Sequence, residues 1–302
     1  MGEGGASGGP GDGKANFDHI YDEPDPREYF RTLARYDYEI PQQAEPVFRQ
    51  LLAAREQAPD ADDVHPPWVL DLCCSYGINA ALLCCEVTLA ELFARYTGAE
   101  LADVSTDELA EADTAFYAER RRAAAPRVGG LDLAGNAVAY ARRVGLLDDG
   151  WSENLEEQLP SPELNDHLGQ VSLVTATGGV GYITARTFDS VVQPRPDGQL
   201  PWVAAFVLRT YSYAGVAELL SQRGLVTEVL AGCPFPQRRF ASDAEREAAL
   251  GAVVRNGHDP AGQEDGGRYY ADLYLSRPPE DAARRSVEEL LADVVASRGG
   301  DT

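Results

Sequence analysis

The fold is decided by one stretch of sequence, Trp68-Val-Leu-Asp-Leu-Cys-Cys-Ser-Tyr-Gly-Ile-Asn-Ala-Ala-Leu-Leu83. It begins as an apolar run that reaches a carboxylate at Asp71. A turn of small residues follows and contains Gly77, and an apolar, Ala-rich helix begins near Asn79. Strand, tight turn and helix in this order direct backbone N–H groups and a helix N-terminus toward one edge of a sheet, where nucleotide-like ligands bind. The stretch therefore predicts a site for such a ligand.

The chain on both sides of this stretch alternates apolar strands with helical segments. Continuous apolar runs without polar alternation are typical of parallel strands that are covered on both faces. No helical pattern is evident between the last two strands, so they are expected to pair antiparallel. The sequence predicts an α/β fold with a doubly wound, mostly parallel sheet. The expected strands lie at residues 68–73, 126–133, 151–152, 171–176, 201–209, 226–231 and 269–275.

The remaining segments are assigned from composition and periodicity. Residues 1–14 hold seven of the 29 glycines and are expected to be a disordered tail. Ser105 and Glu108 form a capping box for a helix inside a helical insertion. The expected units are an N-terminal helical lid at 15–58, a ligand-binding domain at 59–277 with its insertion at 86–125, and a C-terminal helix and tail at 278–302.

Composition excludes several classes of partner. The formal net charge is −23, and such a surface repels the phosphate backbone of nucleic acids and anionic lipid. No apolar run is long enough for a transmembrane helix, and the first residues lack the features of a secretory signal. The five cysteines include two adjacent pairs whose spacing is not a zinc pattern, so reduced core thiols are expected. These features favour a cytoplasmic protein that acts on a small molecule, without nucleic acid, membrane or metal.

Polar residues stand where the predicted strands end. Asp71 and Asp132 stand at the ends of their predicted strands, Asn154 comes just after the strand at 151–152, and a glycine-rich loop at 177–182 follows another strand. Ligands of open α/β sheets bind beyond these carboxyl ends. Asp132 is placed to accept hydrogen bonds from a ribose diol, and Asp71 suits an ammonium or a sulfonium by charge. The alternative is that these residues only cap turns, and that the glycines only permit a tight turn.

Aromatic residues supply the catalytic candidates. An aromatic cluster lies in polar surroundings near the N-terminus and consists of Tyr21, Tyr29, Phe30, Tyr36 and Tyr38. Aromatic faces attract a sulfonium as they attract ammonium. The alternative is that they pack the lid onto the body. Tyr182, next to the glycine loop, is the first candidate for a hydrogen-bond partner or aromatic wall, and Tyr76 is the second.

Charged residues near the expected entrance add further candidates. His19 is a candidate general base near the lid, because histidine is the usual proton carrier at neutral pH. Arg238 and Arg239 are candidates for lining the entrance toward an acidic substrate. The alternative is that both arginines only form salt bridges in a very acidic protein.

These residues together resemble the class I S-adenosylmethionine-dependent methyltransferases. Val69 to Gly77 is similar to the family's first motif, V-L-D-L-G-C-G-T-G, with Cys73 and Ser75 in place of two glycines and Tyr76 in place of threonine. The resemblance covers about residues 60–277. It implies S-adenosylmethionine as cofactor and a Rossmann-like sheet whose last strand is antiparallel. The cofactor-binding residues that it implies are Asp71, Cys73, Ser75, Tyr76, Gly77, Asp132, Leu133, Asn136, Asn154, Leu155, Thr177, Gly178 and Gly179.

Three longer matches narrow the resemblance. The Asp-Pro-Arg-Glu-Tyr-Phe start at 25–30, the Cys-Cys-Ser-Tyr-Gly turn and the Thr-Gly-Gly-Val-Gly-Tyr loop resemble a bacterial subgroup described generically as methyltransferases. They are also similar to enzymes that cyclise S-adenosylmethionine to azetidine-2-carboxylate and release methylthioadenosine. The expected function is methyl transfer to a small-molecule acceptor in bacterial specialised metabolism. The alternatives are cyclisation of the cofactor and non-catalytic binding, and the oligomeric state is open between monomer and homodimer.

Overall fold

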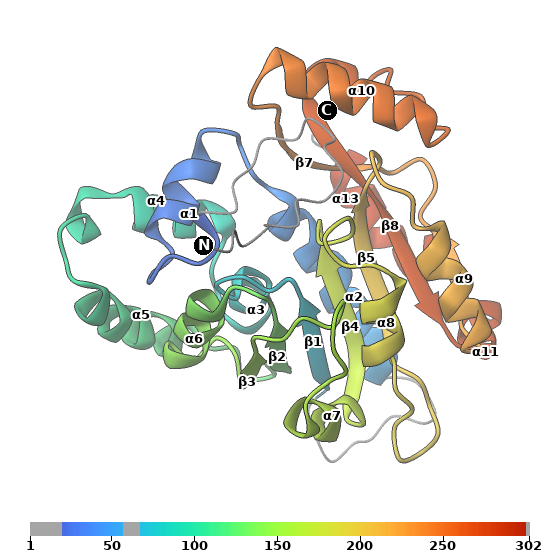
Figure 1. The fold of residues 1–302 in the computed structure, drawn as a ribbon, viewed down its shortest axis with the longest axis horizontal. Helices are drawn as coiled ribbons and strands as arrows, with labels where there is room; N and C mark the ends of the chain where they lie inside the picture. Colours follow the sequence, from blue (N-terminus) through green and yellow to red (C-terminus); the bar gives the residue numbers. More distant parts are fainter. Residues whose placement is uncertain (1–19, 57–66, 300–302) are drawn as a thin grey trace, which may run out of the picture.

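The computed structural model of the chain describes residues 20–56 and 67–299, so the tail expected at 1–14 lies outside the described residues. Its centre is an eight-stranded sheet in the order β3-β2-β1-β4-β5-β8-β6, with β7 paired to β8 (Figure 1). The strands are β1 (Trp68–Leu72), β2 (Arg127–Leu131), β3 (Asp149–Trp151), β4 (Val171–Thr177), β5 (Trp202–Leu208), β6 (Val226–Val229), β7 (Phe235–Arg239) and β8 (Arg268–Arg277).

The pairing confirms the predicted fold class. The five strands β3, β2, β1, β4 and β5 run parallel to their neighbours. β8 runs antiparallel to β5, β6 and β7, so the antiparallel pairing expected for the last two strands is also confirmed. The strand order changes direction between β1 and β4, which is where doubly wound sheets bind ligands.

Helices cover both faces of the sheet, and alternate strand residues enter the apolar cluster on each face. Val69 and Phe206 belong to the cluster on the face of α2 and α3, and Leu70 and Val203 to the cluster on the face of α7 to α9. The helices are α1 (Arg27–Ala34), α2 (Ile40–Glu56), α3 (Ile78–Cys84), α4 (Leu89–Thr97), α5 (Thr106–Arg120), α6 (Gly135–Arg143), α7 (Pro162–Leu168), α8 (Ala185–Val191), α9 (Ala214–Gln222), α10 (Asp243–Arg255), α11 (Pro279–Arg284), α12 (Val287–Leu290) and α13 (Ala292–Gly299).

Of the predicted lid at 15–58, the structure describes residues 20–56, and its two helices pack in different places. Helix α2 packs on α3, β4 and β7, and Ala44, Val47 and Phe48 on it are fully buried. The Phe48 ring meets the ring of Phe206 on β5 at 5.5 Å between centroids. Helix α2 is therefore part of the layer that covers the sheet, and only the segment before it is free to serve as a cover. Helix α1 packs against α4 of the insertion.

Two other expectations are corrected near the C-terminus. The chain between β6 and β8 forms β7 and α10, which the sequence pattern did not reveal. Helix α10 buries the charged Glu245 next to small residues such as Ala249, so its apolar stripe is weak. The single helix expected up to the tail is broken, because Ser286 starts a new helix with a capping box to Glu289. None of the helices within 20–56 and 67–299 is long and apolar enough to cross a membrane.

The insertion at 86–125 is held by a buried carboxylate. Asp113 is fully buried and accepts hydrogen bonds from the hydroxyls of Tyr96 and Tyr140, both at 2.6 Å. Arg95 forms an ion pair with the same carboxylate at 2.6 Å. The predicted capping box at the start of α5 is confirmed. The insertion is thus tied to α6, which borders the candidate site.

Candidate ligand-binding site

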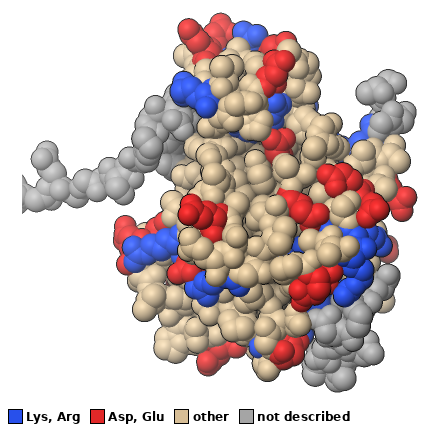
Figure 2. Space-filling model, turned by 90° about the vertical axis from the view of Figure 1, so that its right-hand side faces the viewer, with Lys and Arg blue, Asp and Glu red and all other residues tan. Residues whose placement is uncertain are grey.

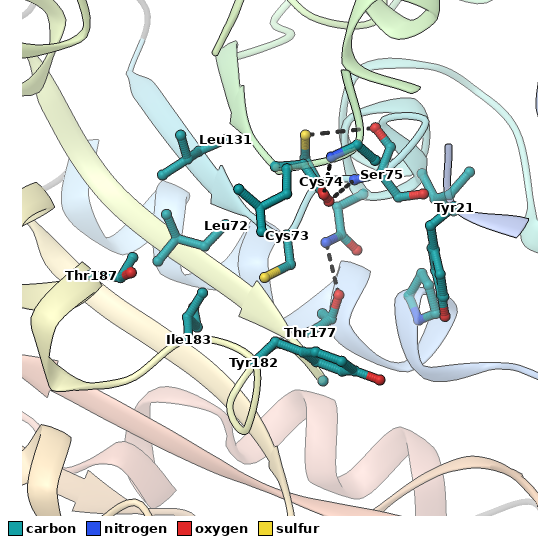
Figure 3. Close-up of a pocket in the computed structure, with 18 of the residues that line it drawn as sticks. Tyr21, Leu72, Cys73, Cys74, Ser75, Leu131, Thr177, Tyr182, Ile183 and Thr187 are labelled. Carbon is teal, nitrogen blue, oxygen red and sulfur yellow. Dashed lines mark hydrogen bonds between the residues drawn. The ribbon is translucent and has the colours of Figure 1, made fainter. Parts of the chain in front are cut away.

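A cavity of about 470 Å³ lies at the carboxyl ends of β1, β2 and β4. Figure 3 shows Tyr21 and Tyr182 entering the same space as Cys73 and Thr177 from separate segments of the chain. Most of the predicted site residues line this cavity. They are Tyr29, Cys73, Ser75, Asp132, Leu133, Asn154, Leu155, Thr177, Gly178, Gly179 and Tyr182.

The turn after β1 keeps the backbone of a glycine turn although it carries side chains. Cys73 has φ of 56°, Ser75 of 48° and Gly77 of 74°, so left-handed residues alternate at the three places where the family motif has glycine. A left-handed conformation costs about 1–2 kcal/mol for a residue with a side chain. The backbone N–H of Cys73 donates to the Leu131 carbonyl at 2.8 Å, which ties the turn to β2.

Gly77 itself serves packing and does not line the cavity. It begins α3, and a Cβ at this position would lie 3.2 Å from the Cβ of Ala141 on α6. The glycine therefore permits close approach of α3 and α6.

Asp132 occupies the centre of the cavity wall. One carboxylate oxygen accepts from the backbone N–H of Ser75 at 2.8 Å, and the other accepts from that of Ala134 at 3.0 Å. Burial raises the pKa of Asp132, while these hydrogen bonds lower it and the charge of Asp22 raises it further. Each oxygen keeps a second lone-pair direction, so the carboxylate can accept from a diol.

Asp71, which the sequence predicts to contact the ligand, lies beneath the cavity wall and is not among the residues that line the cavity. Its side chain is 1% exposed and accepts hydrogen bonds from Thr175 at 2.8 Å and from Asn79 at 3.0 Å. Burial raises the pKa of Asp71 to about 7, against the effect of these hydrogen bonds. The Asn79 side-chain amide also donates to the Thr177 hydroxyl at 3.0 Å, so Asn79 links the buried Asp71 to a residue that lines the cavity.

The loop after β3 forms another wall. Leu155 on this loop is buried and lines the cavity, and Leu133, which follows β2, is 64% exposed and lines it as well. The Asn154 side-chain oxygen accepts from the backbone N–H of Glu156 at 3.1 Å. Glu156 in turn accepts from the hydroxyls of Thr184 and Thr187, both at 2.6 Å. Glu156, which the sequence pattern did not single out, therefore joins this loop to the start of α8.

The glycine loop after β4 fits closely around its neighbours. Gly178 has φ of 74°, and a Cβ there would lie 2.6 Å from the Gln237 amide nitrogen. A Cβ at Gly179 would lie 2.7 Å from the Cys73 sulfur. The glycines thus allow the loop, the first turn and β7 to meet at one point. Tyr182 at the tip of the loop is 58% exposed and lines the cavity.

Phenol side chains make up the wall on the N-terminal side. The Tyr29 ring lies 5.7 Å from that of Tyr21 and 6.2 Å from that of Tyr38, both edge to face. Burial raises the pKa of Tyr38 to about 12 and that of Tyr21 further still. These phenols are therefore neutral at physiological pH and act as hydrogen-bond donors and aromatic faces, not as bases. Tyr21 and Tyr38, named in the sequence only as cluster members, belong to the cavity.

Tyr76, Asn136 and His19 do not line the cavity. Tyr76 is 1% exposed, and its hydroxyl donates to the Glu23 carbonyl at 2.9 Å. Asn136 is bonded to Asp22 through its backbone N–H and its side-chain amide, at 2.7 and 2.8 Å. Tyr76, a predicted catalytic residue, and Asn136, a predicted cofactor-binding residue, both contact the segment before α1. His19 lies outside the described residues.

The two arginines differ in their surroundings. Arg238 lines the cavity and is 3% exposed, but it is paired with the equally buried Glu245 at 2.7 Å. Arg239 pairs with Asp37 at 2.9 Å, outside the cavity lining. The expected alternative of salt-bridge partners therefore describes both contacts. The other charged residues of the lining, Asp22, Asp132, Glu153 and Glu156, are acidic, so the cavity favours a cation over an anion.

Other features of the surface and the thiols bear on the predicted chemistry. All five cysteines are free, as predicted. In the described part of the chain no group of three or more His, Cys, Asp or Glu side chains is arranged to hold a metal ion. Figure 2 shows acidic and basic side chains interspersed over the face that it draws.

Comparisons with known proteins give structural neighbours only. No protein-family model matches the sequence. No curated protein matches it either. Among solved structures, the magnesium protoporphyrin IX methyltransferase of Synechocystis PCC 6803 with bound SAM is 10% identical, with TM-score 0.38, over 83% of this chain and 84% of that chain.

Two further neighbours carry similar descriptions. The plantazolicin methyltransferase BpumL in complex with SAH is 7% identical, with TM-score 0.42, over 86% of this chain and 93% of that chain. A TehB-like SAM-dependent methyltransferase from Corynebacterium glutamicum is 12% identical, with TM-score 0.35, over 78% of this chain and 96% of that chain. Likenesses of this degree assign no activity to the chain, which leaves the site itself as the basis for a function.

Proposed function

We propose that the protein is an S-adenosylmethionine-dependent enzyme that transfers a methyl group to a small-molecule acceptor. The observation that carries the proposal is the setting of Asp132. Its carboxylate lies at the end of β2, is held by backbone N–H groups from the turn after β1 and from the start of α6, and faces a cavity of about 470 Å³. A carboxylate at this place in a doubly wound sheet suits a ribose diol.

The remaining walls suit the rest of the cofactor. Leu133 and Leu155 offer apolar surface for an adenine beside Asp132. The turn at Cys73 and the loop at Gly179 meet on the other side, and both line the part of the cavity that is proposed to take the methionine portion. Asp71 beneath the wall adds a negative field once ionised, which favours a sulfonium over a neutral sulfur.

The chemistry asks for positioning and dehydration more than for acid or base groups. When bound, the cofactor supplies an electrophilic methyl group. The neutral phenols of Tyr21, Tyr29 and Tyr38 surround the space where an acceptor would lie and exclude water from it. Tyr182, exposed at the loop tip, is proposed to close the opposite side and to donate a hydrogen bond to the acceptor. On the basis of the resemblance to a bacterial subgroup, we further propose that the acceptor belongs to bacterial specialised metabolism and that the enzyme is cytoplasmic.

Cyclisation of the cofactor is kept as a second candidate because of one observation. Cys73 and Ser75 place side chains on left-handed positions that the family motif fills with glycine, and both line the cavity. Added side chains at the methionine end favour a bent pose, in which the cofactor's amine reaches its own γ-carbon. The C–S bond then breaks, methylthioadenosine leaves, and the nitrogen loses a proton to give azetidine-2-carboxylate.

One incubation separates the candidates. Purified protein is mixed with S-adenosylmethionine, with and without a panel of small nucleophiles, and the products are identified by mass spectrometry. Methyl transfer predicts S-adenosylhomocysteine that depends on an added acceptor. Cyclisation predicts methylthioadenosine without any acceptor and above the uncatalysed rate. Binding of the cofactor without either product would leave only non-catalytic binding and would contradict the proposal.

A further inference from the structure

The segment Ile20–Asp25, called here the cover segment, is fastened along the rim of the cavity. Within it, Tyr21 and Asp22 line the cavity, whereas Ile20 is fully buried. Asp25 anchors its far end by accepting from the Thr106 hydroxyl of the insertion at 2.8 Å. The segment thus brings an aromatic ring and a carboxylate to the cavity from a part of the chain far from the sheet.

Two residues near the carboxyl ends of β1 and β2 make hydrogen bonds to the middle of the cover segment. The Tyr76 hydroxyl donates to the Glu23 carbonyl at 2.9 Å and lies 3.3 Å from the Ile20 carbonyl oxygen. Asn136, at the start of α6, donates to Asp22 through its backbone and its side chain. A threonine in place of Tyr76, as in the family motif, is too short to replace the reach of the phenol.

Tyr76 does not line the cavity, and its contacts account for its size. The ring is buried at the back of the turn, where it packs edge to face with Tyr29 at 5.8 Å and with Tyr140 at 6.3 Å. Its neighbours Ser75 and Asp132 share the hydrogen bond that forms the cavity wall. One residue therefore joins the turn that shapes the ligand site to the segment that covers it.

We propose that Tyr76 is a positioning residue that holds the cover segment closed, so that Asp22 and Tyr21 complete the ligand site. Asp22 lies within electrostatic range of Asp132, and the two carboxylates flank the start of α6. One oxygen of Asp22 is held by Asn136, and Asp22 lines the cavity, so its second oxygen is proposed to accept from a ligand hydroxyl or to face a cation. The proposal rests on the proposed function for the identity of the ligand, but not for the fastening of the segment.

The backbone amide of Asn136 reports the closed segment without any ligand. It lies in the first turn of α6, where an amide has no partner within the helix, and its partner is the Asp22 carboxylate. Tyr76→Phe removes only the hydroxyl, and Tyr140→Phe is the matched control because it removes a neighbouring buried hydroxyl whose partner is Asp113. Amide hydrogen exchange at Asn136 is measured by NMR in the ligand-free proteins.

The expected result is exchange about fivefold faster at Asn136 in Tyr76→Phe, equivalent to about 1 kcal/mol for the lost hydrogen bond, and unchanged exchange in Tyr140→Phe. Calorimetry with S-adenosylhomocysteine should show a dissociation constant about fivefold higher in Tyr76→Phe only. The double variant with Asn136→Ala should weaken binding by less than the product of the single effects, because both residues hold one segment.

Each other outcome has a definite meaning. Equal exchange at Asn136 in Tyr76→Phe and in the parent overturns the fastening. Faster exchange with unchanged S-adenosylhomocysteine affinity overturns the contribution of the segment to the ligand site. Failure of the parent protein to bind S-adenosylhomocysteine refutes the proposed function and the ligand part of this inference, and the exchange experiment then decides the fastening alone.

Discussion

Replacement of Asp132 by asparagine or alanine is the most informative single change. The carboxylate is proposed to accept both ribose hydroxyls, and a hydrogen bond to a charged group contributes about 1.5–3 kcal/mol. Asparagine keeps one carbonyl acceptor, so Asp132→Asn should weaken S-adenosylhomocysteine binding by about 10- to 100-fold. Alanine removes both acceptors, and Asp132→Ala should weaken binding by at least about 100-fold.

The structure also sets the cost of these variants to folding. Asp132 accepts the Ser75 and Ala134 N–H groups, and leaving such a group without a partner costs about 1–3 kcal/mol. Binding is measured by isothermal titration calorimetry, and thermal melting by circular dichroism shows whether each variant is folded at the titration temperature. A loss of binding in a variant that remains folded is then attributable to the site.

Asp148 provides the matched control for this experiment. It lies near the opposite end of β2 and also accepts a backbone N–H, from Val128 at 2.8 Å. Asp148→Asn should reduce stability in a similar way and leave S-adenosylhomocysteine affinity unchanged. The assignment of Asp132 to the ribose is refuted if Asp132→Asn binds about as tightly as the parent, or if Asp148→Asn loses affinity to the same extent.

Neighbouring residues allow three further tests. Burial raises the pKa of Asp71 to about 7, so its carboxylate ionises as the pH rises from about 6 to about 8, and the affinity for S-adenosylmethionine relative to S-adenosylhomocysteine should increase. The increase should be up to about 30-fold, for an effective dielectric constant of about 20 and a separation on the order of 8 Å between carboxylate and sulfonium. Paired titrations with the two compounds measure this ratio, and a ratio that does not change with pH contradicts the prediction. Gly179→Ala should destabilise the fold more than Gly169→Ala, by at least about 1 kcal/mol in chemical denaturation. A Cβ at Gly179 would lie 2.7 Å from the Cys73 sulfur and 3.1 Å from the Cys73 Cβ, whereas nothing lies within 4 Å of one at Gly169. Equal losses contradict the close packing of the loop. Burial raises the pKa of Glu156, but the hydrogen bonds from Thr184 and Thr187 lower it more, so its folded pKa lies below the unfolded value of about 4.5. The stabilisation from Glu156 is therefore present above the unfolded pKa and is lost as the pH falls through the folded pKa. Glu156→Gln should lower the melting temperature at about pH 7 and reduce the difference in melting temperature between about pH 7 and about pH 3, and an unchanged difference contradicts this account.

The sheet was predictable because its signals are local. The apolar run at 68–72, the turn to Gly77 and the strand-end acid Asp132 are each evident from a few consecutive residues, and the doubly wound order follows from alternating strands and helices. The cavity lining around Asp132 was therefore largely recovered. Helix α10 was missed although Ser242 is a local capping signal at its start, because the buried Glu245 interrupts its apolar stripe. Ser286 is the same kind of signal at the start of α12.

The contacts that the sequence did not reveal involve partners far away in the sequence. Asp71 was expected to contact the ligand, because the sequence does not show that Thr175 on β4 would cover its carboxylate. Tyr76 looked catalytic because its partners, Ile20 and Glu23, lie in a segment whose path is not encoded near the motif. Tertiary hydrogen bonds of this kind, over more than fifty positions, carry no periodic or spacing signal.

The turn after β1 shows how far a motif can depart in sequence and keep its geometry. Cys73 and Ser75 retain the left-handed conformations of the glycines in the resembled motif, because the Leu131 carbonyl and the Asp132 carboxylate accept their N–H groups. The motif was thus predictable as a backbone path. Where the sequence departs from it, the added side chains of Cys73 and Ser75 face the cavity and change the surface that a ligand meets.

A crystal structure of the protein with S-adenosylhomocysteine tests the central claim most directly. The account predicts the ribose hydroxyls on the Asp132 carboxylate, the adenine against Leu155, and the homocysteine portion against the surface that Cys73 and Gly179 form together. A ligand bound elsewhere, or bound in this cavity with its ribose away from Asp132, would contradict the account.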